Sequence, residues 1–397
     1  MRTAETGGET TLRALRLQDL RGYGSLAASF GRGPQLIWGP NGAGKTSLLE
    51  AIGLLARGGS HRTTADGELI RWGAEVARIE GDLSGSAEGA AIAVEIVIAR
   101  AGTGARKRIR VNGIARRATA LSTHLRVVLF APEDMLLVAG SPSLRRVAID
   151  TLASQRSPAY AADLSTYGRA LAQRNRLLRA VREEGADRAQ LRYWDAPLIE
   201  AGAALVAERL RLLEELAEPL RLTHAEIAPE EAATANLAVA YRSNVPYGDG
   251  PGIRDALARR LEETADKEVW NGATLVGPHR DDLGFALGDR DLADFGSRGQ
   301  QRTAILAFKL AELDLLTAHD RRPPLLLLDD VFSELDPDRR GHLVRRIASL
   351  PQAFVTTTTP DDLDPSLVQA SAGWQVRSDQ GGGASLEPGD ATRGAAG

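Results

Sequence analysis

The sequence contains no cysteine, and this absence alone excludes several classes of protein. Without cysteine there is no disulfide framework, no iron–sulfur cluster and no zinc site built on thiolates. No apolar run reaches the roughly 18 residues that a membrane-spanning helix needs. The polar stretch from Met1 to Thr11 lacks the apolar segment of a signal peptide, so we expect a soluble cytoplasmic protein without a membrane partner.

Lysine is also scarce, since the chain has only Lys45, Lys107, Lys267 and Lys309. Arginine therefore supplies nearly all of the positive charge, a bias that a GC-rich genome produces without functional meaning. The formal net charge is −3, which does not indicate a polybasic chain but allows a local basic face. Lys45 is notable for this reason, because it lies in a sequence motif, described below, that contains lysine although most basic residues of this chain are arginine.

The 397 residues suffice for two or three domains, and their patterns predict an α/β fold that a helical insertion interrupts. Alternating or short apolar runs predict strands at residues 12–17, 36–38, 94–99, 107–111, 126–130, 237–241, 274–276, 283–287, 325–328 and 353–357. Helical spacing predicts helices at 48–55 and 300–316, and two longer helices on either side of a polar break at 183–187.

These elements predict an α/β domain in two halves, separated by the insertion. The halves are expected at residues 1–140 and 269–378, and the helical insertion at 141–268. Ser141 before Pro142 predicts the first helix of the insertion, with the serine hydroxyl as its cap. The tail at 379–397, which is rich in glycine, alanine and serine, is expected to be disordered.

A complete phosphate-binding loop pattern lies between an expected strand and an expected helix. Its residues are Gly39, Pro40, Asn41, Gly42, Ala43, Gly44, Lys45, Thr46 and Ser47. The glycines let the backbone curl so that its N–H groups face a phosphate at the positive end of the helix dipole. Lys45 is expected to neutralise the β- and γ-phosphates of ATP, and Thr46 to bind Mg²⁺ through its hydroxyl.

Two acids at the end of the expected strand 325–328 form the second half of such a site. A strand that ends in aspartate is common, and capping or a turn is then an equally good explanation. Beside a phosphate loop, we interpret Asp329 as the Mg²⁺ ligand and Asp330 as the acid that positions the attacking water. Positions 45 and 329 lie much further apart than the corresponding residues of nucleotide kinases and small GTPases.

Two further motifs lie near these acids. Ser297, Gly299 and Gln300, at an expected helix start, resemble the signature motif of ATP-binding-cassette ATPases, and residues 333–336 (SELD) resemble their D-loop. In those proteins the signature of one subunit completes the phosphate site of another. A serine hydroxyl, glycine N–H groups and a helix N-terminus suit a γ-phosphate. Taken alone, Ser297 is equally well explained as a plain helix cap.

Within that superfamily, the sequence resembles the RecF family of bacterial recombination mediators from about residue 12 to residue 357. The resemblance rests on the segments 21–23 (RGY), 39–52 (GPNGAGKTSLLEAI), 60–63 (SHRT), 132–134 (PED), 140–142 (GSP), 145–146 (RR), 173–175 (QRN), 277–282 (GPHRDD) and 325–336 (LLLLDDVFSELD).

The resemblance implies an ABC-type ATPase head, similar to those of SMC and Rad50 proteins, with a short, mainly helical arm. It implies ATP and Mg²⁺ as cofactors and an ATP-dependent homodimer. It further implies binding to DNA at single-strand/double-strand junctions, and action with RecR and RecO when recombinase replaces single-strand-binding protein. Because the chain is acidic overall, its DNA site must be a local arginine face, and we expect Arg62 to belong to it.

The sequence departs from the wider cassette pattern in three places, and all three indicate slow hydrolysis. Asp330 stands where transporters carry glutamate, and residues 356–359 (TTTT) stand where a switch histidine is expected. No glutamine marks the metal-sensing loop near residues 130–133, where Glu133 or Asp134 could substitute.

Several interpretations stay open at this point. A cassette ATPase that energises a membrane transporter is the main alternative, although the three departures and the insertion argue against it. A chromosome-organising head normally has a far longer insertion. His279 in the segment 277–282 could support the nucleotide site or only a turn. The arginine pairs 145–146, 321–322 and 339–340 could contact DNA phosphates or form solvated helix faces.

Overall fold

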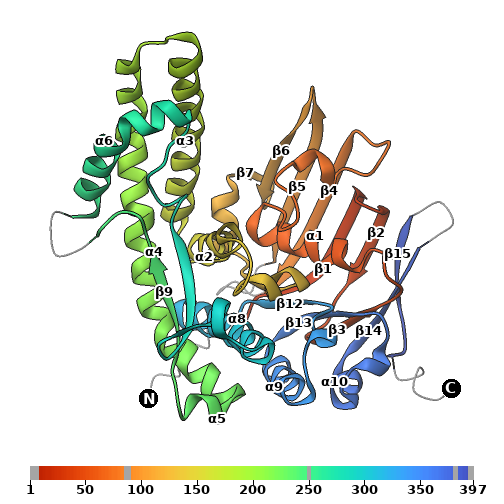
Figure 1. Cartoon of the computed structure of the whole chain (residues 1–397). Helices are drawn as coiled ribbons and strands as arrows, with labels where there is room; N and C mark the ends of the chain where they lie inside the picture. Colours follow the sequence, from red (N-terminus) through yellow and green to blue (C-terminus); the bar gives the residue numbers. More distant parts are fainter. Residues whose placement is uncertain (1–8, 85–90, 248–251, 379–382, 392–397) are drawn as a thin grey trace, which may run out of the picture. The chain divides into compact units, whose positions relative to one another are not determined.

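The computed structural model describes residues 9–84, 91–247, 252–378 and 383–391 (Figure 1). The chain forms two compact units, which we call the first unit and the second unit. The first unit comprises Met1–Met135, Glu226–Ala228 and Ile305–Gly397, and the second comprises Leu136–Ala225 and Pro229–Ala304. Among the described helices, none has both the length and the apolar character that crossing a bilayer requires.

A six-stranded antiparallel sheet forms one layer of the first unit, in the order β2-β1-β4-β5-β6-β7. Its strands are β1 (Thr11–Leu20), β2 (Tyr23–Ser29), β4 (Val76–Ser84), β5 (Ile92–Ala101), β6 (Gly104–Val111) and β7 (Ile114–Arg116). Leu15 and Leu17 of β1 are buried while Arg16 between them is exposed, as the alternating sequence predicts. The predicted hairpin is confirmed, since β5 and β6 pair across a turn at Gly102, whose φ is 57°.

A second six-stranded sheet of the first unit has the order β15-β14-β3-β13-β12-β8. Its strands are β3 (Gly33–Trp38), β8 (Val127–Phe130), β12 (Leu325–Asp329), β13 (Gln352–Thr357), β14 (Ala372–Ser378) and β15 (Ala384–Pro388). All neighbouring pairs are parallel except β14 with β15. The carboxyl ends of β3 and β12 therefore lie at the same edge of the sheet. In open α/β sheets, ligands bind at the carboxyl ends of the parallel strands.

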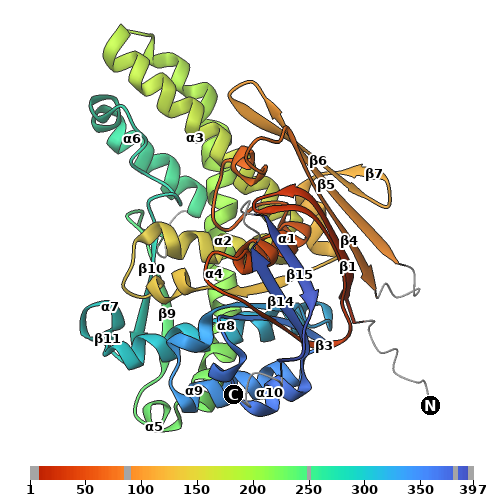
Figure 2. The ribbon, with the colours of Figure 1, turned by 90° about the vertical axis from the view of Figure 1, so that its right-hand side faces the viewer.

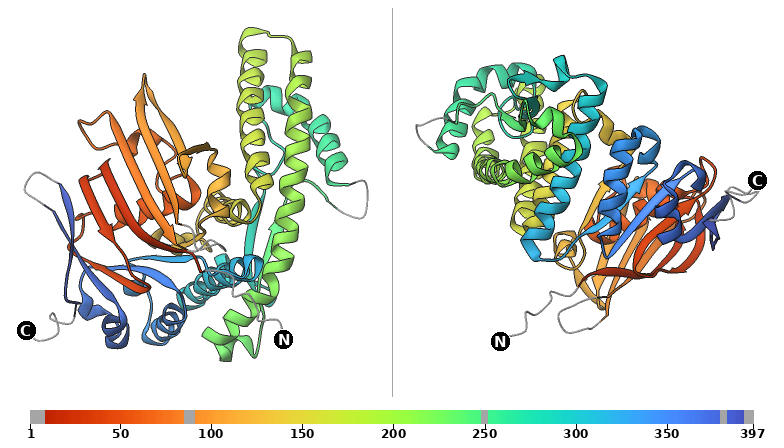
Figure 3. Two further views of the ribbon diagram at one scale, coloured as in Figure 1. Left: turned by 180° about the vertical axis from the view of Figure 1, so that it is seen from behind. Right: turned by 90° about the horizontal axis from the view of Figure 1, so that it is seen from below.

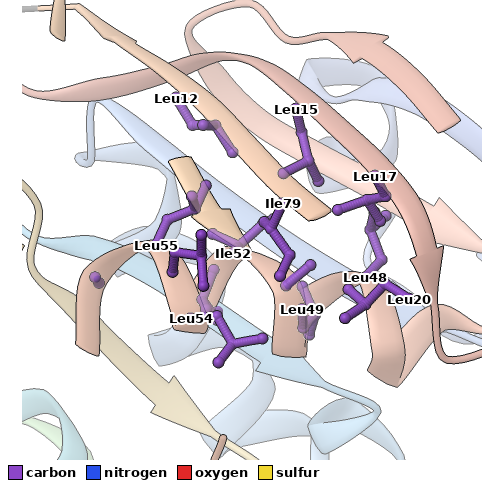
Figure 4. Close-up of a cluster of buried hydrophobic side chains, with 14 of the residues drawn as sticks. Leu12, Leu15, Leu17, Leu20, Leu48, Leu49, Ile52, Leu54, Leu55 and Ile79 are labelled. Atoms are coloured by element: carbon purple, nitrogen blue, oxygen red, sulfur yellow. The ribbon is translucent and has the colours of Figure 1, made fainter. Parts of the chain in front are cut away.

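Helix α1 (Lys45–Arg57) packs between these two sheets and is buried along most of its length. Figure 4 shows Leu48, Ile52 and Leu55 of α1 beside Leu15 of β1 and Ile79 of β4, all without solvent exposure. Each such side chain contributes about 1.5–3 kcal/mol when it leaves water. The core of the first unit thus fixes the helix whose N-terminus follows the predicted phosphate loop.

The other helices of the first unit connect or cover its strands. They are η1 (Asp66–Leu69), η2 (Ala118–Thr123), η3 (Pro132–Leu136), η5 (Val331–Glu334), α9 (Pro337–Ala348), η6 (Pro360–Asp362) and α10 (Pro365–Ala370). Both α9 and α10 contact β3. Helix α8 (Arg298–Asp320) begins in the second unit and continues in the first.

The expected disorder of the tail is wrong for residues 384–388, which form β15 at the edge of the parallel sheet (Figure 2). Leu386 packs against the core, and the Ala384 N–H donates to the Gly22 carbonyl at 2.9 Å. This strand alternates inward and outward side chains within a composition that otherwise indicates disorder. Residue 383 and residues 389–391 are described as well, whereas the tail positions 379–382 and 392–397 lie outside the described residues.

The second unit consists mainly of long helices with a small antiparallel sheet (Figure 3). Its elements are α2 (Pro142–Arg156), α3 (Pro158–Glu184), η4 (Arg188–Leu191), α4 (Arg192–Ile227), α5 (Pro229–Ala232), β9 (Leu237–Arg242), α6 (Ile253–Asn271), β10 (Asp282–Leu287), β11 (Arg290–Asp291) and α7 (Leu292–Phe295). Helices α3 and α4 confirm the two predicted longer helices. They are separated at Gly185, which ends α3 in the left-handed conformation.

Three expectations for this unit need correction. The boundary expected at 268 lies near 304, because β10 pairs with β9 and so joins the segment after α6 to the second unit. Residues 274–276 form no strand, because side chains bond their backbone: the Thr274 N–H donates to Asn175 and the Leu275 N–H to Glu268, both at 2.7 Å. Ser141 occupies the cap position of α2, but its hydroxyl bonds Ser143 instead of the backbone.

Candidate nucleotide site

The predicted phosphate loop connects β3 to α1 at the carboxyl edge of the parallel sheet. Gly44 caps α1 with a φ of 116°, a conformation that a residue with a side chain adopts only under strain. A Cβ at Gly39 would collide with the carbonyl oxygen of Val376 on β14. The loop therefore needs glycine at both ends, one for its backbone conformation and one for a close approach.

Lys45 lies folded over the loop that precedes it. Its Nζ donates to the carbonyl oxygens of Gly39 at 2.7 Å and Pro40 at 3.1 Å, and the side chain is buried. Burial lowers the pKa of Lys45, while the negative charges of Asp330 and Asp329 act in the opposite direction. The ammonium group is thus held in place beside two carboxylates, in the position from which a lysine of this loop reaches phosphate oxygens.

Tyr23 supports the loop from β2, a role that the sequence reasoning did not assign. Its ring is fully buried, and its hydroxyl donates to the carbonyl oxygen of Gly44 at 3.1 Å. This carbonyl also accepts the first hydrogen bond of α1, from the Leu48 N–H at 3.0 Å. The only sequence signal was the position of Tyr23 in the RGY segment.

Asp329 ends β12 and is buried, and its neighbour on β13 holds it in place. Thr356 lies directly opposite Asp329 in the parallel register, and its hydroxyl donates to Asp329 Oδ1 at 2.8 Å. The same hydroxyl oxygen accepts the N–H of Asp330 at 3.0 Å. The threonine that stands in place of a switch histidine therefore fixes both acids of the site.

Asp330 follows in the left-handed conformation, with a φ of 54°. Burial raises the pKa of its carboxyl group, the Lys45 ammonium opposes this, and the charge of Asp329 adds to it. Its carbonyl oxygen accepts the Ser333 hydroxyl at 2.8 Å, which ties the predicted D-loop to the acid. A half-buried carboxylate with a raised pKa beside a buried lysine is suited to orient a water molecule and accept its proton.

The residues predicted to bind Mg²⁺ fit that ion. Thr46 lies in the first turn of α1, and its hydroxyl makes no hydrogen bond to any described residue, so it is free to bind a ligand. Within the described ranges, no group of three or more histidine and acidic side chains could hold a metal alone. A hydroxyl and one carboxylate, completed by phosphate oxygens and water, is the type of site that Mg²⁺ prefers.

The loop in place of the metal-sensing glutamine is partly immobilised by ion pairing. Asp134 accepts the Ala131 N–H at 2.9 Å, and its other oxygen lies 3.2 Å from Lys309 Nζ on α8. Glu133 is exposed and makes no hydrogen bond or ion pair with any described residue. Of the two acids considered as substitutes, only Glu133 therefore has an uncommitted carboxylate.

The predicted signature residues lie in the second unit, at the start of α8. The Gln300 N–H donates to the Ser297 hydroxyl at 3.2 Å, and the Ser297 N–H donates to Gln300 Oε1 at 3.0 Å. This reciprocal pair is a capping box, so the plain structural explanation for Ser297 holds. Because Oγ only accepts in this pair, its own proton stays available to a phosphate oxygen.

The segment 277–282 belongs to a polar network of the second unit. Burial lowers the pKa of His279 to about 4. Its Nε2 lies 3.2 Å from the Thr274 carbonyl oxygen and donates to it, so Nδ1 accepts the Tyr167 hydroxyl at 2.6 Å. Arg145 forms two bonds to Asp282, at 2.8 and 2.9 Å, and Arg146 donates to a backbone carbonyl at 2.7 Å. These contacts favour the turn-supporting role of His279, and they commit this arginine pair to the fold instead of to DNA.

Arg62 lies in the first unit, on the loop after α1. Its guanidinium is 40% exposed and lies 3.6 Å from Glu50, a fully buried carboxylate of α1. Glu50 also accepts two bonds from Arg21, at 2.8 and 2.9 Å, and one from the Ser60 hydroxyl. The helix that begins at the phosphate loop therefore also anchors the loop of the predicted DNA contact.

Comparison with known proteins gives one consistent result. The family described as RecF/RecN/SMC N terminal domain matches residues 11–373. The DNA replication and repair protein RecF of Heliobacterium modesticaldum is 38% identical over 372 residues, which cover 93% of this chain and 98% of that protein. The protein of the same name from Geobacillus kaustophilus is 39% identical over 375 residues, covering 92% and 98%.

Solved structures agree with this. A structure described as the recombination mediator protein RecF-ATPrS in the RecFOR pathway has a TM-score of 0.84 and 30% identity, covering 96% of this chain and 99% of that one. The Smc head domain of Pyrococcus furiosus has a TM-score of 0.54 at 15% identity, covering 97% and 98%, which supports the fold alone. The chain therefore belongs to the RecF family, and its fold is that of an SMC-like ABC-type ATPase head with a mainly helical inserted domain.

Proposed function

We propose that this chain is an ATP-dependent DNA-binding protein of recombinational repair and replication restart. ATP joins two copies into a clamp on gapped or junction DNA, and slow hydrolysis releases the clamp. The observation that carries the proposal is the site of the first unit. It combines a complete phosphate loop with two acids, Asp329 and Asp330, that hydrogen bonds to the Thr356 hydroxyl hold in place. Relatives named as DNA replication and repair proteins support the biological setting.

The chemistry of the site follows from its charges. The N–H groups at the start of α1 and the Lys45 ammonium bind the phosphates of ATP. Thr46 and Asp329 hold Mg²⁺, which neutralises charge on the phosphates. Asp330 orients the attacking water and takes its proton. A second protomer is expected to supply the hydroxyl of Ser297 and the N–H of Gly299, as the signature motif of one subunit completes the phosphate site of another in ATP-binding-cassette ATPases.

Two features of Asp330 support slow hydrolysis: the length of its side chain and the hydrogen bond that holds its backbone. Asp330 is one methylene shorter than the glutamate of transporters, so its carboxylate has less reach toward a water molecule. Thr356 holds the backbone N–H of Asp330, which limits how far this acid can shift. A long-lived ATP state suits a protein that must stay on DNA while partners assemble, and RecO and RecR are the partners that the RecFOR pathway of the structural relative suggests.

A transporter subunit is not supported as a second function. The similarity to relatives named RecF covers more than nine-tenths of this chain and of each of the two relatives described.

The decisive experiment measures DNA binding and ATP turnover together. Fluorescence anisotropy with gapped and blunt duplex DNA is recorded with ATP, with ADP and without nucleotide. We expect tight binding to gapped DNA only with ATP, and slow ATP turnover. DNA affinity that is the same with ATP, with ADP and without nucleotide would overturn the proposal, and so would the absence of DNA binding.

Asp330→Asn is expected to bind ATP with wild-type affinity but to hydrolyse it at least about 100-fold more slowly, because only the proton acceptor is lost. Asparagine tolerates the left-handed backbone at this position, so the loop keeps its shape. The measurement is single-turnover hydrolysis beside equilibrium ATP binding. Asp338→Asn, a change at an exposed acid of α9, is the matched control. Wild-type turnover by Asp330→Asn would remove the role assigned to this acid.

Arg62→Gln is expected to weaken duplex binding about 3- to 10-fold and to lower the slope of log affinity against log salt by about 0.9, because one phosphate contact is lost. The measurement is a salt titration of DNA affinity in ATP. Arg16→Gln is the control, since Arg16 has a similar exposure but is paired with two acids, Glu80 at 3.2 Å and Asp82 at 3.0 Å, whereas Arg62 lies 3.6 Å from Glu50. An unchanged salt slope for Arg62→Gln would place the DNA elsewhere.

A further inference from the structure

The helix α3 has an unusual distribution of charge. Residues 164–182 contain five arginines and no acidic residue. This segment lies within the second unit and contains none of the residues assigned to the nucleotide. A run of one sign is often a solvated helix face, so the question is which of these charges the fold itself uses.

Two of the five arginines have partners within the fold. Arg174 is buried and lies 2.8 Å from Asp195 and 2.7 Å from Glu268. Arg182 bonds the carbonyl oxygen of Asn271 at 3.0 Å and pairs with Glu183. These two side chains hold α3 against α4 and α6.

The other three arginines face solvent and have no acidic partner among the described residues. Arg169 donates only to the Thr166 hydroxyl, at 3.3 Å. Arg176 and Arg179 are exposed and pair with no carboxylate of the described part of the chain. Arg169 and Arg176 are seven residues apart and therefore share one face of the helix. That face carries positive charge that the fold does not neutralise.

A groove of about 450 Å³ lies beside this face, between α3 and the start of α4. Arg176 and Gln173 line it from α3, Gln190 lines it from η4, and Tyr193 and Trp194 line it from the first turn of α4. Tyr193 is 80% exposed, although an aromatic ring of this size normally gains stability by burial. No carboxylate lines the groove.

This combination of groups fits the chemistry of unpaired nucleotides. Aromatic rings stack on bases of any sequence, arginine neutralises the phosphate beside them, and amide side chains bond the polar edges of exposed bases. A duplex offers no free base faces to Tyr193, because its bases are already stacked on one another. The absence of a carboxylate also removes the repulsion that would keep a nucleic acid strand away.

We propose that this aromatic groove of the second unit binds the single-stranded part of the DNA, with Tyr193 and Trp194 stacking on bases and Arg176 contacting a phosphate. The inference rests on the proposed function, since it assumes a protein that binds DNA, and it adds where and how the unpaired strand is recognised. Duplex and single strand are then read by different surfaces, Arg62 on the first unit and the aromatic groove on the second.

The test uses the full chain in ATP, with an oligo(dT) strand of about 16 nucleotides and a blunt duplex as separate probes in fluorescence anisotropy. Tyr193→Ala is expected to bind oligo(dT) about 5- to 100-fold more weakly while duplex affinity stays unchanged. Tyr193→Phe keeps the ring and is expected to restore the affinity. Trp270→Ala is the matched control, because this tryptophan of α6 is 78% exposed and does not line the groove.

Each outcome decides the question. If Tyr193→Ala binds oligo(dT) as wild type does, or loses oligo(dT) and duplex equally, the aromatic groove is not a single-strand site. If oligo(dT) binding is kept but binding of purified RecR or RecO is lost, the groove docks a protein and the proposal falls. If the wild-type protein binds neither probe, the proposed function itself fails, which is a distinct result from an unaffected variant.

Discussion

Lys45→Met is expected to weaken ATP binding at least about 100-fold, because it removes the ammonium group that bonds the phosphates in the proposed site. Each charge-assisted bond of this kind contributes about 1.5–3 kcal/mol, and the lysine makes more than one. The glycines and N–H groups of the loop remain in this variant, but methionine supplies no positive charge. Isothermal titration with ATP measures the loss. Lys45→Arg is expected to keep part of the binding with little turnover, since a planar guanidinium cannot replace a compact ammonium.

Lys107→Met is the control for this experiment. Lys107 lies in the same unit and pairs with Asp66 at 2.7 Å, outside the nucleotide site. Its loss is expected to leave ATP affinity unchanged. If Lys45→Met bound ATP as tightly as wild type, the assignment of the phosphate loop would be wrong, however well its backbone matches.

Ser297→Arg is expected to bind ATP but to remain a monomer, with at least about a 100-fold loss of dimer affinity. In the proposed dimer the γ-phosphate gains its Ser297 and Gly299 donors from the second protomer. Charge-assisted bonds of about 1.5–3 kcal/mol each are then lost at both sites of a symmetric dimer, and the long side chain blocks the approach. Sedimentation velocity with ATP and with ADP measures the association, and wild type with ADP is expected to dissociate.

The capping box requires a second variant, because Ser297 also begins α8. Ser297→Ala removes the cap and costs about 0.5–2 kcal/mol of stability, without adding bulk. Ser349→Arg adds the same side chain at an exposed serine on the first unit and is the control for charge. A Ser297→Arg protein that still forms a dimer with ATP would contradict the shared site, whatever its DNA binding.

The parts of the site that could be predicted from the sequence are those written in contiguous motifs. The phosphate loop lies between a strand and a helix as predicted, and Asp329 ends the expected buried strand. Ser297 caps a helix, in agreement with the expected helix start at this motif. In each case a local pattern is sufficient, because neighbouring residues in the chain determine the geometry.

The rest depends on contacts between residues that are distant in the chain. Thr356 becomes important only because β13 pairs in parallel with β12, and Tyr23 only because β2 brings it under Gly44. The boundary near 304 follows from the pairing of β9 with β10. No local pattern encodes such pairings, so a motif-based prediction identifies the reacting groups but misses the residues that position them.

The left-handed backbone at Asp330 also bears on how this site can evolve. Aspartate and asparagine enter that conformation more readily than longer side chains, so the backbone itself filters which acids selection can test here. Exchange of Asp330 for the glutamate of transporter ATPases is therefore expected to strain this turn unless a neighbouring change relieves the strain.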